Sequence, residues 1–156
     1  MAARRYDIRA LDRGEVLRYL GYAGQPLSAE LDARVDQMVA RCLAVARPSG
    51  CARVFGVAGR GERDGVPVLR LDGCALELEG RSIARHLDGA VAVGVLAVTA
   101  GLALDAELRR LALTDRVGEV LLDAAGSALV ERAADEAEAD LARDAAARGL
   151  VAGPRF

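Results

Sequence analysis

The sequence has 156 residues and a formal net charge of −2; 53% of the residues are hydrophobic, 3% are aromatic and none is tryptophan. This length predicts a single domain spanning residues 1–156, with a core of Ala, Val and Leu instead of large rings. The near-neutral charge argues against nucleic acid or an anionic membrane surface as a partner. The longest uncharged apolar stretch, residues 89–104, is too short to cross a bilayer. Three widely spaced cysteines and no apolar leader predict a reduced, cytoplasmic protein.

The first third of the chain predicts an edge strand and two helices. Residues 5–11 alternate weakly in hydropathy, which favours an edge strand. Asp12 lies three residues before Glu15, the spacing of a capping box, so a short helix is expected to follow and to end at Leu20. From Ser28 to Ala46 the apolar residues recur with a helical period, and this segment predicts a longer amphipathic helix.

The middle of the chain has the pattern of strands. Residues 51–58 alternate in hydropathy, and the glycine-rich, charged residues 59–65 predict an exposed turn. Two further strands are expected at residues 66–71 and 74–78. The Asp-Gly dipeptide at residues 72–73 suits a two-residue type I′ turn between them.

The remainder predicts one more strand among helices. Residues 80–87 indicate one or two helical turns, and residues 90–100 are apolar on both faces, which predicts a central strand. Asp105 is expected to cap a helix that runs through Arg116. A second, long helix, broken from the first or bent near Asp115, is expected over about residues 117–147. This order of elements indicates an α+β or mixed α/β domain.

No catalytic motif stands out. The glycines at residues 56–61 lack the spacing and the following helix of a dinucleotide loop. Ser127 sits among alanines in a predicted helix, where packing is the better interpretation. His86 is the sole histidine and has no nucleophile suggested beside it, so a structural or surface role is favoured over a functional one. The acidic residues at 135–140 fall among alanines, with Arg132 and Arg143 three or four positions away, which is typical of a solvated, salt-bridged face.

Three segments carry a combined pattern: residues 12–25, 78–87 and 91–141. They read Asp-Arg-Gly-Glu-Val-Leu-Arg-Tyr-Leu-Gly-Tyr-Ala-Gly-Gln, then Leu-Glu-Leu-Glu-Gly-Arg-Ser-Ile-Ala-Arg-His-Leu. The third is an apolar strand, a Thr-Ala-Gly turn and a helical Leu-Leu-Asp-Ala-Ala-Gly-Ser-Ala run. In order and spacing they resemble the activation domain of cobalamin-dependent methionine synthase, in its small stand-alone form. That resemblance implies an α+β fold with a twisted antiparallel sheet flanked by helices, the Val91–Leu141 segment supplying the central strand and small-residue helices.

The resemblance also implies a function in methionine biosynthesis. It is an accessory role in corrinoid-dependent methyl transfer: the reactivation of cobalamin-dependent methionine synthase, a methyltransferase, with S-adenosylmethionine. Arg155 and Phe156 resemble the first two residues of the family's loop, Arg-x-x-x-Gly-Tyr, commonly Arg-Phe-Ser-Pro-Gly-Tyr in the stand-alone forms. Arg155 is implied to pair with the cofactor's carboxylate. The rest of this cofactor loop is missing after Phe156. Either the chain is truncated or this member has lost S-adenosylmethionine binding.

Cobalamin is expected only through a partner, because no Asp-x-His-x-x-Gly corrinoid motif occurs in the sequence. The implied partner is a corrinoid-binding methyltransferase subunit. No catalytic residue and no metal ligand is assigned, and the isolated chain is expected not to be catalytic. The alternative is a non-catalytic partner-binding module that retains the fold without binding S-adenosylmethionine.

Overall fold

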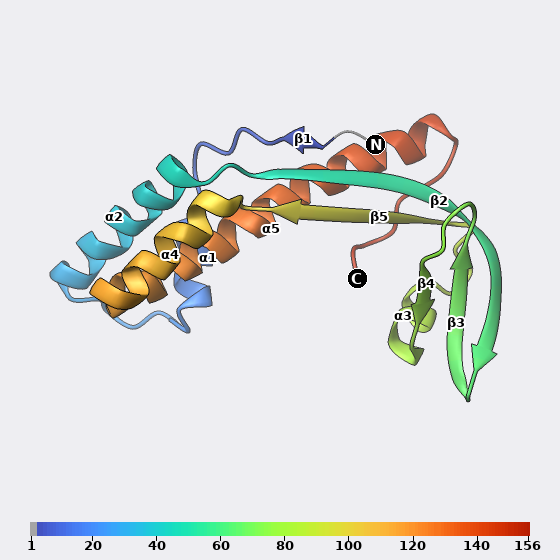
Figure 1. The fold of residues 1–156 in the computed structure, drawn as a ribbon, viewed down its shortest axis with the longest axis horizontal. Helices are drawn as coiled ribbons and strands as arrows, with labels where there is room; N and C mark the ends of the chain where they lie inside the picture. Colours follow the sequence, from blue (N-terminus) through green and yellow to red (C-terminus); the bar gives the residue numbers. More distant parts are fainter. Residues whose placement is uncertain (1–2) are drawn as a thin grey trace. The chain divides into compact units, whose positions relative to one another are not determined.

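The computed structural model describes residues 3–156, which contain five helices and five strands (Figure 1). The strands form a twisted antiparallel sheet, so the α+β class expected from the sequence is confirmed. Contacts divide the chain into two compact units. The first comprises residues up to Cys51 and Ala97–Ala137, and the second comprises Ala52–Leu96 and Glu138–Phe156. Within residues 3–156, no helix combines the length and the apolar character that crossing a bilayer requires.

The elements are distributed unequally between the two units. The first unit contains β1 (Arg4–Arg5), α1 (Arg13–Tyr19), α2 (Ala29–Val45), α4 (Leu102–Thr114) and most of α5 (Arg116–Ala147). The second contains most of β2 (Ser49–Arg63), β3 (Val66–Leu71), β4 (Glu77–Glu79), α3 (Arg81–His86) and most of β5 (Ala92–Thr99). The first unit is therefore mainly helical, and the second is mainly strand.

The helix starts follow local capping chemistry. The Asp12 carboxylate accepts a hydrogen bond from the Gly14 amide at 2.7 Å, and Ser28 Oγ accepts one from the Leu31 amide at 3.2 Å. Both predicted caps are therefore confirmed. The capping box is only half formed, because Glu15 pairs with an arginine of its own helix instead of returning to the backbone of Asp12.

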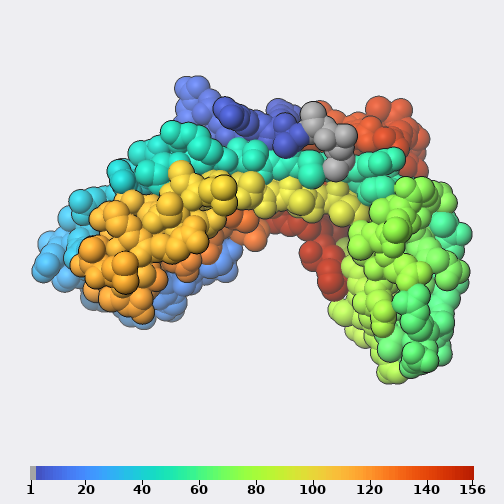
Figure 2. Space-filling model, in the orientation of Figure 1, coloured from blue at the N-terminus to red at the C-terminus, as the bar shows by residue number. Residues whose placement is uncertain are grey.

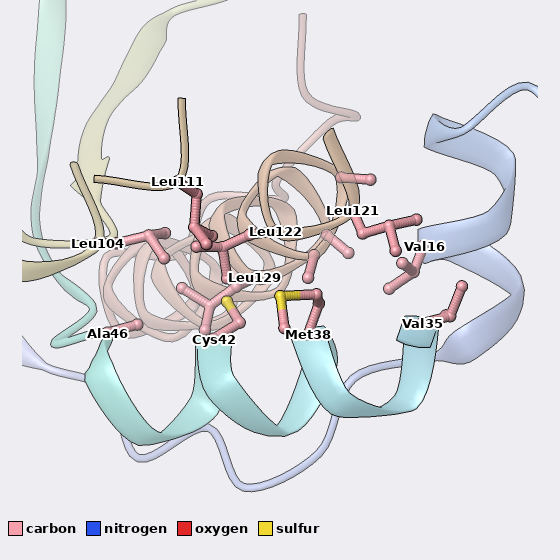
Figure 3. Close-up of a cluster of buried hydrophobic side chains, with 13 residues drawn as sticks. Val16, Val35, Met38, Cys42, Ala46, Leu104, Leu111, Leu121, Leu122 and Leu129 are labelled. Carbon is pink, nitrogen blue, oxygen red and sulfur yellow. The ribbon is translucent and has the colours of Figure 1, made fainter. Parts of the chain in front are cut away.

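The core of the first unit lies between α1, α2, α4 and α5. Figure 3 shows Met38 and Cys42 of α2 pointing toward Leu122 and Leu129 of α5, and all four side chains are buried. Figure 2 shows α2 and α4 side by side at the surface of this unit. Such contacts between small and branched side chains replace the aromatic rings that the composition excludes.

Small residues of α5 allow this close packing. A Cβ added at Gly126 would come within 3.0 Å of Leu104 Cδ2, a distance tighter than ordinary van der Waals contact. The neighbouring alanines 124, 125 and 128 are buried. The small-residue run that the sequence marks as a site of close approach is thus the place where α4 crosses α5.

Asp115 separates α4 from α5. Its extended backbone ends α4, and its carboxylate then accepts a hydrogen bond from the Gly118 amide at 3.0 Å, which caps α5. That amide and the paired guanidinium of Arg34 lower the pKa of Asp115. The predicted break at this point is confirmed. The predicted start of α4 is wrong, because the helix begins after Gly101 and Asp105 lies within its first turn.

The predicted hairpin between residues 66–71 and 74–78 forms, because β3 and β4 pair antiparallel, but its predicted two-residue turn at residues 72–73 is wrong. β2 does not end before residue 59 but continues to Arg63, and the two-residue turn is Asp64-Gly65. Both turn residues have positive φ, 51° and 79°, as a type I′ turn requires. At residues 72–73 a longer loop follows instead, and β4 starts at Glu77. Cross-strand pairing with β3 holds the glycine-rich segment extended, although its sequence resembles a loop.

The sheet is organised around β2, not around β5. β2 pairs with β1, β3 and β5, whereas β5 pairs with β2 alone among the described residues, so the prediction of a central strand at residues 90–100 is wrong. A Cβ at Gly50 would lie 2.7 Å from the Ala97 carbonyl oxygen, which explains how β2 approaches β5 closely here. The predicted edge strand at residues 5–11 shortens to β1, because its weak alternation buries only Tyr6 at that end.

Candidate functional site

One groove in the second unit brings together residues from four parts of the chain. Its volume is about 350 Å³. We call it the tail groove, and it is lined by Leu78, Ile83, His86, Leu87, Ala92, Val93, Gly94, Val95, Leu96, Glu138, Leu141, Pro154, Arg155 and Phe156. The lining is largely apolar, with charged groups at Glu138 and Arg155, a combination typical of small-molecule sites.

The floor of the tail groove is built by β5 and the last turns of α5. Gly94 allows the strand to approach the helix, because a Cβ there would lie 3.1 Å from Leu141 Cδ1. Val93 is buried with Leu69 and Leu71 of β3, so β5 has one face in the small core of this unit. A larger residue at position 94 would require Leu141 to shift.

His86 stands in the last turn of α3, where the short helix carries it to the surface. Its Nε2 lies 3.0 Å from the carbonyl oxygen of Pro154, and its ring centroid lies 5.2 Å from that of Phe156 with the planes tilted by 54°. Donation to Pro154 requires the tautomer with the proton on Nε2. The sequence assigns His86 a structural or surface role, and its contacts with the C-terminal segment agree with that interpretation.

Arg155 lies at the rim of the tail groove. Its guanidinium forms an ion pair with the Glu138 carboxylate of α5 at 3.4 Å, and both side chains are about one-third exposed. Opposite charges so placed act as a partly screened surface pair. The structure therefore brings the predicted cofactor-binding residue to a groove, beside a carboxylate that the sequence did not assign to it.

Glu138 was missed because its helix looks uniformly salt-bridged. Arg132 pairs with Glu136, and Arg143 pairs with Asp140, as the helical spacing predicts. Glu138 has no arginine three or four residues away in either direction. The absence of a local arginine was the signal in the sequence, because such a carboxylate can form an ion pair with a residue distant in the sequence.

The remaining candidates stay outside the tail groove. Ser127 lies in α5 of the first unit, and Cys42 is buried in the core there, where burial raises the pKa of its thiol to about 11. The three cysteines are free. Across residues 3–156, no cluster of three or more His, Cys, Asp or Glu side chains has an arrangement able to hold a metal ion.

The tail groove can hold a small molecule that carries both charges on an apolar body. A carboxylate on the ligand would face Arg155, a cationic group would face Glu138, and the apolar part would lie against β5 and α3.

Comparison with known families finds no family model that matches the chain, and comparison with curated proteins finds no matching sequence.

Proposed function

We propose that this chain is an accessory domain for corrinoid-dependent methyl transfer, acting in the reactivation of cobalamin-dependent methionine synthase. In this proposal the tail groove receives S-adenosylmethionine, with Arg155 as the contact for its carboxylate. The corrinoid arrives on a partner methyltransferase subunit.

One observation carries the proposal. Two of the three segments on which the family resemblance rests, residues 78–87 and 91–141, both supply lining residues of the tail groove. Arg155, the residue implied to contact the cofactor, lies at the rim of the same groove. The sequence pattern alone selected these residues, which are far apart along the chain. In the folded chain they line the same tail groove.

The side chains present fit the chemistry of S-adenosylmethionine. Its amino-acid end carries a carboxylate and an ammonium group, for which Arg155 and Glu138 provide opposite charges. Its adenine ring is flat, and the apolar β5 surface with Phe156 offers contacts for the faces of that ring. The groove volume of about 350 Å³ lies in the range of small-molecule sites.

Within this function the chain's own residues bind and orient. Arg155 would fix the amino-acid end of the ligand, and exchange of the Arg155–Glu138 pair for ligand contacts would hold that end at the rim. The apolar floor would exclude water from the body of the ligand. When bound, S-adenosylmethionine would supply the methyl group.

A specific observation favours the alternative of a non-catalytic docking module. Arg155 is already paired with Glu138, and Pro154 and Phe156 contact His86, so the chain's own segment lines the groove. A module of this kind would keep the fold and bind a partner without S-adenosylmethionine.

Isothermal titration calorimetry with S-adenosylmethionine separates the two functions. We expect saturable binding that Arg155→Ala weakens roughly tenfold or more, because a charge-assisted contact is lost. Arg148→Ala is the matched control, since Arg148 pairs with Asp144 on the exposed end of α5 and lies outside the groove lining. Absence of heat at millimolar ligand would contradict the activation role and favour the docking module.

The partner is tested separately. Immobilised chain should retain a corrinoid-binding methyltransferase subunit from defined, purified components under both functions. If neither apo nor corrinoid-loaded subunit is retained, the accessory role fails even where the cofactor binds.

A further inference from the structure

A second groove lies in the first unit, where α4 meets α5 and the end of β5. Its volume is about 490 Å³, and it shares no lining residue with the tail groove. A Cβ at position 126 would lie 3.0 Å from Leu104 Cδ2, so the glycine there lets the two helices meet at the base of the groove. We call it the acidic groove, and its lining includes Asp105, Leu108, Asp123, Gly126, Val130 and Glu131.

The floor of the acidic groove is apolar and follows two helices. Leu104 and Leu108 lie one turn apart on α4, and Gly126 and Val130 lie one turn apart on α5. Leu104 is buried in the core, whereas Leu108 and Val130 are only half-buried and keep apolar surface in contact with solvent. A floor that repeats every turn matches the side-chain spacing of a third helix laid on it.

The rim of the acidic groove carries three carboxylates, from Asp105, Asp123 and Glu131, and no arginine belongs to the lining. Within residues 3–156, neither Asp105 nor Asp123 has an ion pair or a side-chain hydrogen bond. The sequence is rich in arginine, and elsewhere on α5 that residue neutralises the acids. Four other acids of α5 pair with an arginine three or four residues away: Glu119, Glu136, Asp140 and Asp144.

The spacing of the carboxylates decides which cation fits. Asp123 and Glu131 are eight residues apart on α5, which is about 12 Å along the helix axis. One ammonium group cannot contact both, whereas two cations separated by two helical turns would each lie near a carboxylate. We propose that the acidic groove docks a basic amphipathic helix of a partner protein, with its apolar face on the floor and its lysine or arginine side chains at the rim.

This site is independent of the proposed function, because it lies in the first unit and shares no residue with the tail groove. The probe is a fluorescently labelled synthetic helix of about fifteen residues, with leucines on one face and lysines two turns apart beside them. We expect saturable binding to the full chain by fluorescence anisotropy, several times weaker at high salt than at low salt, because exposed charges are screened. Absence of saturable binding at low salt would overturn the proposal.

The double variant Asp105→Asn, Asp123→Asn tests the rim. We expect it to bind the peptide about tenfold more weakly, because two attractions between exposed charges are lost. The control is Glu30→Gln with Glu62→Gln, which removes two exposed acids that lie outside the groove lining. Far-UV circular dichroism checks that both double variants keep the native helix content. Equal weakening in the two would mean that net charge alone attracts the peptide, and the docking site would be rejected.

A second peptide tests the floor without altering the protein. It keeps every lysine but has glutamine in place of each leucine, and we expect at least about tenfold weaker binding, because the contact with the apolar floor is lost. Glutamine is also a good helix former, so the helix content of the peptide is nearly matched. Equal affinity of the two peptides would show that the groove attracts cations without docking a helix, which contradicts the proposal.

Discussion

The two compact units differ in how they are held together. The first has a cluster of thirteen buried residues drawn mainly from four helices, whereas a smaller cluster in the second contains Leu69, Leu71 and Val93. Stability therefore concentrates in the helical unit, while the tail groove belongs to the unit with the small core. Binding regions are commonly drawn from the less stable parts of a protein, because such parts can rearrange at low cost.

The difference follows from the kind of element in each unit. Helices rich in Ala and Leu bury a continuous stripe, as α5 does with Leu122 and Leu129 against α2. In the second unit, the C-terminal part of β2 consists of glycine and charged residues. Residues 59–63 remain mainly exposed although they pair with β3. Ladder hydrogen bonds fix the shape of that hairpin, but burial adds little to its stability.

The largest expected effect is in the helical core. Leu122 is fully buried, so Leu122→Ala should lower the free energy of unfolding by about 3–4 kcal/mol, through lost burial and the cavity left behind. Urea unfolding followed by circular dichroism measures the change. Leu113→Ala is the control, because Leu113 is 89% exposed and its loss should cost less than about 0.5 kcal/mol. Similar losses in both variants would refute the packing described for α5.

A smaller and local effect is expected in the second unit. Leu69→Ala should cost about 2 kcal/mol, because the side chain is buried in a small cluster that can partly collapse. Amide hydrogen exchange should then accelerate in β3, β4 and β5 while the amides of α2 keep their protection. Leu76→Ala provides the comparison, since Leu76 is exposed in the loop before β4. Equal acceleration of hydrogen exchange in both units would mean that they unfold together, which would contradict the difference in stability between them.

A third prediction concerns pH and the first unit alone. Hydrogen bonds from Arg110 and Arg41 lower the pKa of Glu107 from 4.5 to about 2. Because the folded pKa is the lower one, the stabilisation is complete above pH 4.5 and is lost as the pH falls toward 2. Both arginines are about half exposed, so solvent screening limits the gain to about 1 kcal/mol.

The variant Glu107→Gln tests this carboxylate. It should reduce the difference in unfolding free energy between pH 6 and pH 3 by that amount, measured in urea. Glu136→Gln, which alters an exposed pair, should leave the pH dependence nearly unchanged. An undiminished pH dependence in Glu107→Gln would assign the acid sensitivity to other groups.

The smallest effect is expected at the loop before β5. Arg60 Nη2 donates to the carbonyl oxygens of Leu87 and Ala90 at 2.9 and 2.7 Å. Arg60→Ala should therefore raise hydrogen exchange at residues 87–91, with a global loss below about 1 kcal/mol. Arg53→Ala removes a guanidinium that lies over the Phe55 ring and should not affect this loop. Unaltered exchange in Arg60→Ala would show that the loop is held by its own turn.

The candidate site was only partly visible in the sequence. Arg155 was identified through the family resemblance, and His86 was recognised as a residue without catalytic partners. The sequence could not join these two residues, because their contact depends on the path of the chain after α5, where no local pattern exists. Glu138 was read as one of several solvated acids, and only folding brought Arg155 to it.

Local chemistry determined the helices of this protein: the caps at Asp12 and Ser28, the break at Asp115 and the extent of α5 depend on neighbours within one turn, which the sequence displays. The strands depended on partners far along the chain. Of the two Asp-Gly pairs, Asp64-Gly65 has positive φ at both residues and forms the two-residue turn between β2 and β3, whereas at Asp72-Gly73 the glycine alone has positive φ. Tertiary structure likewise made β2 the strand with most partners and formed the tail groove, because long-range contacts, not local preferences, fix register and bring distant side chains together.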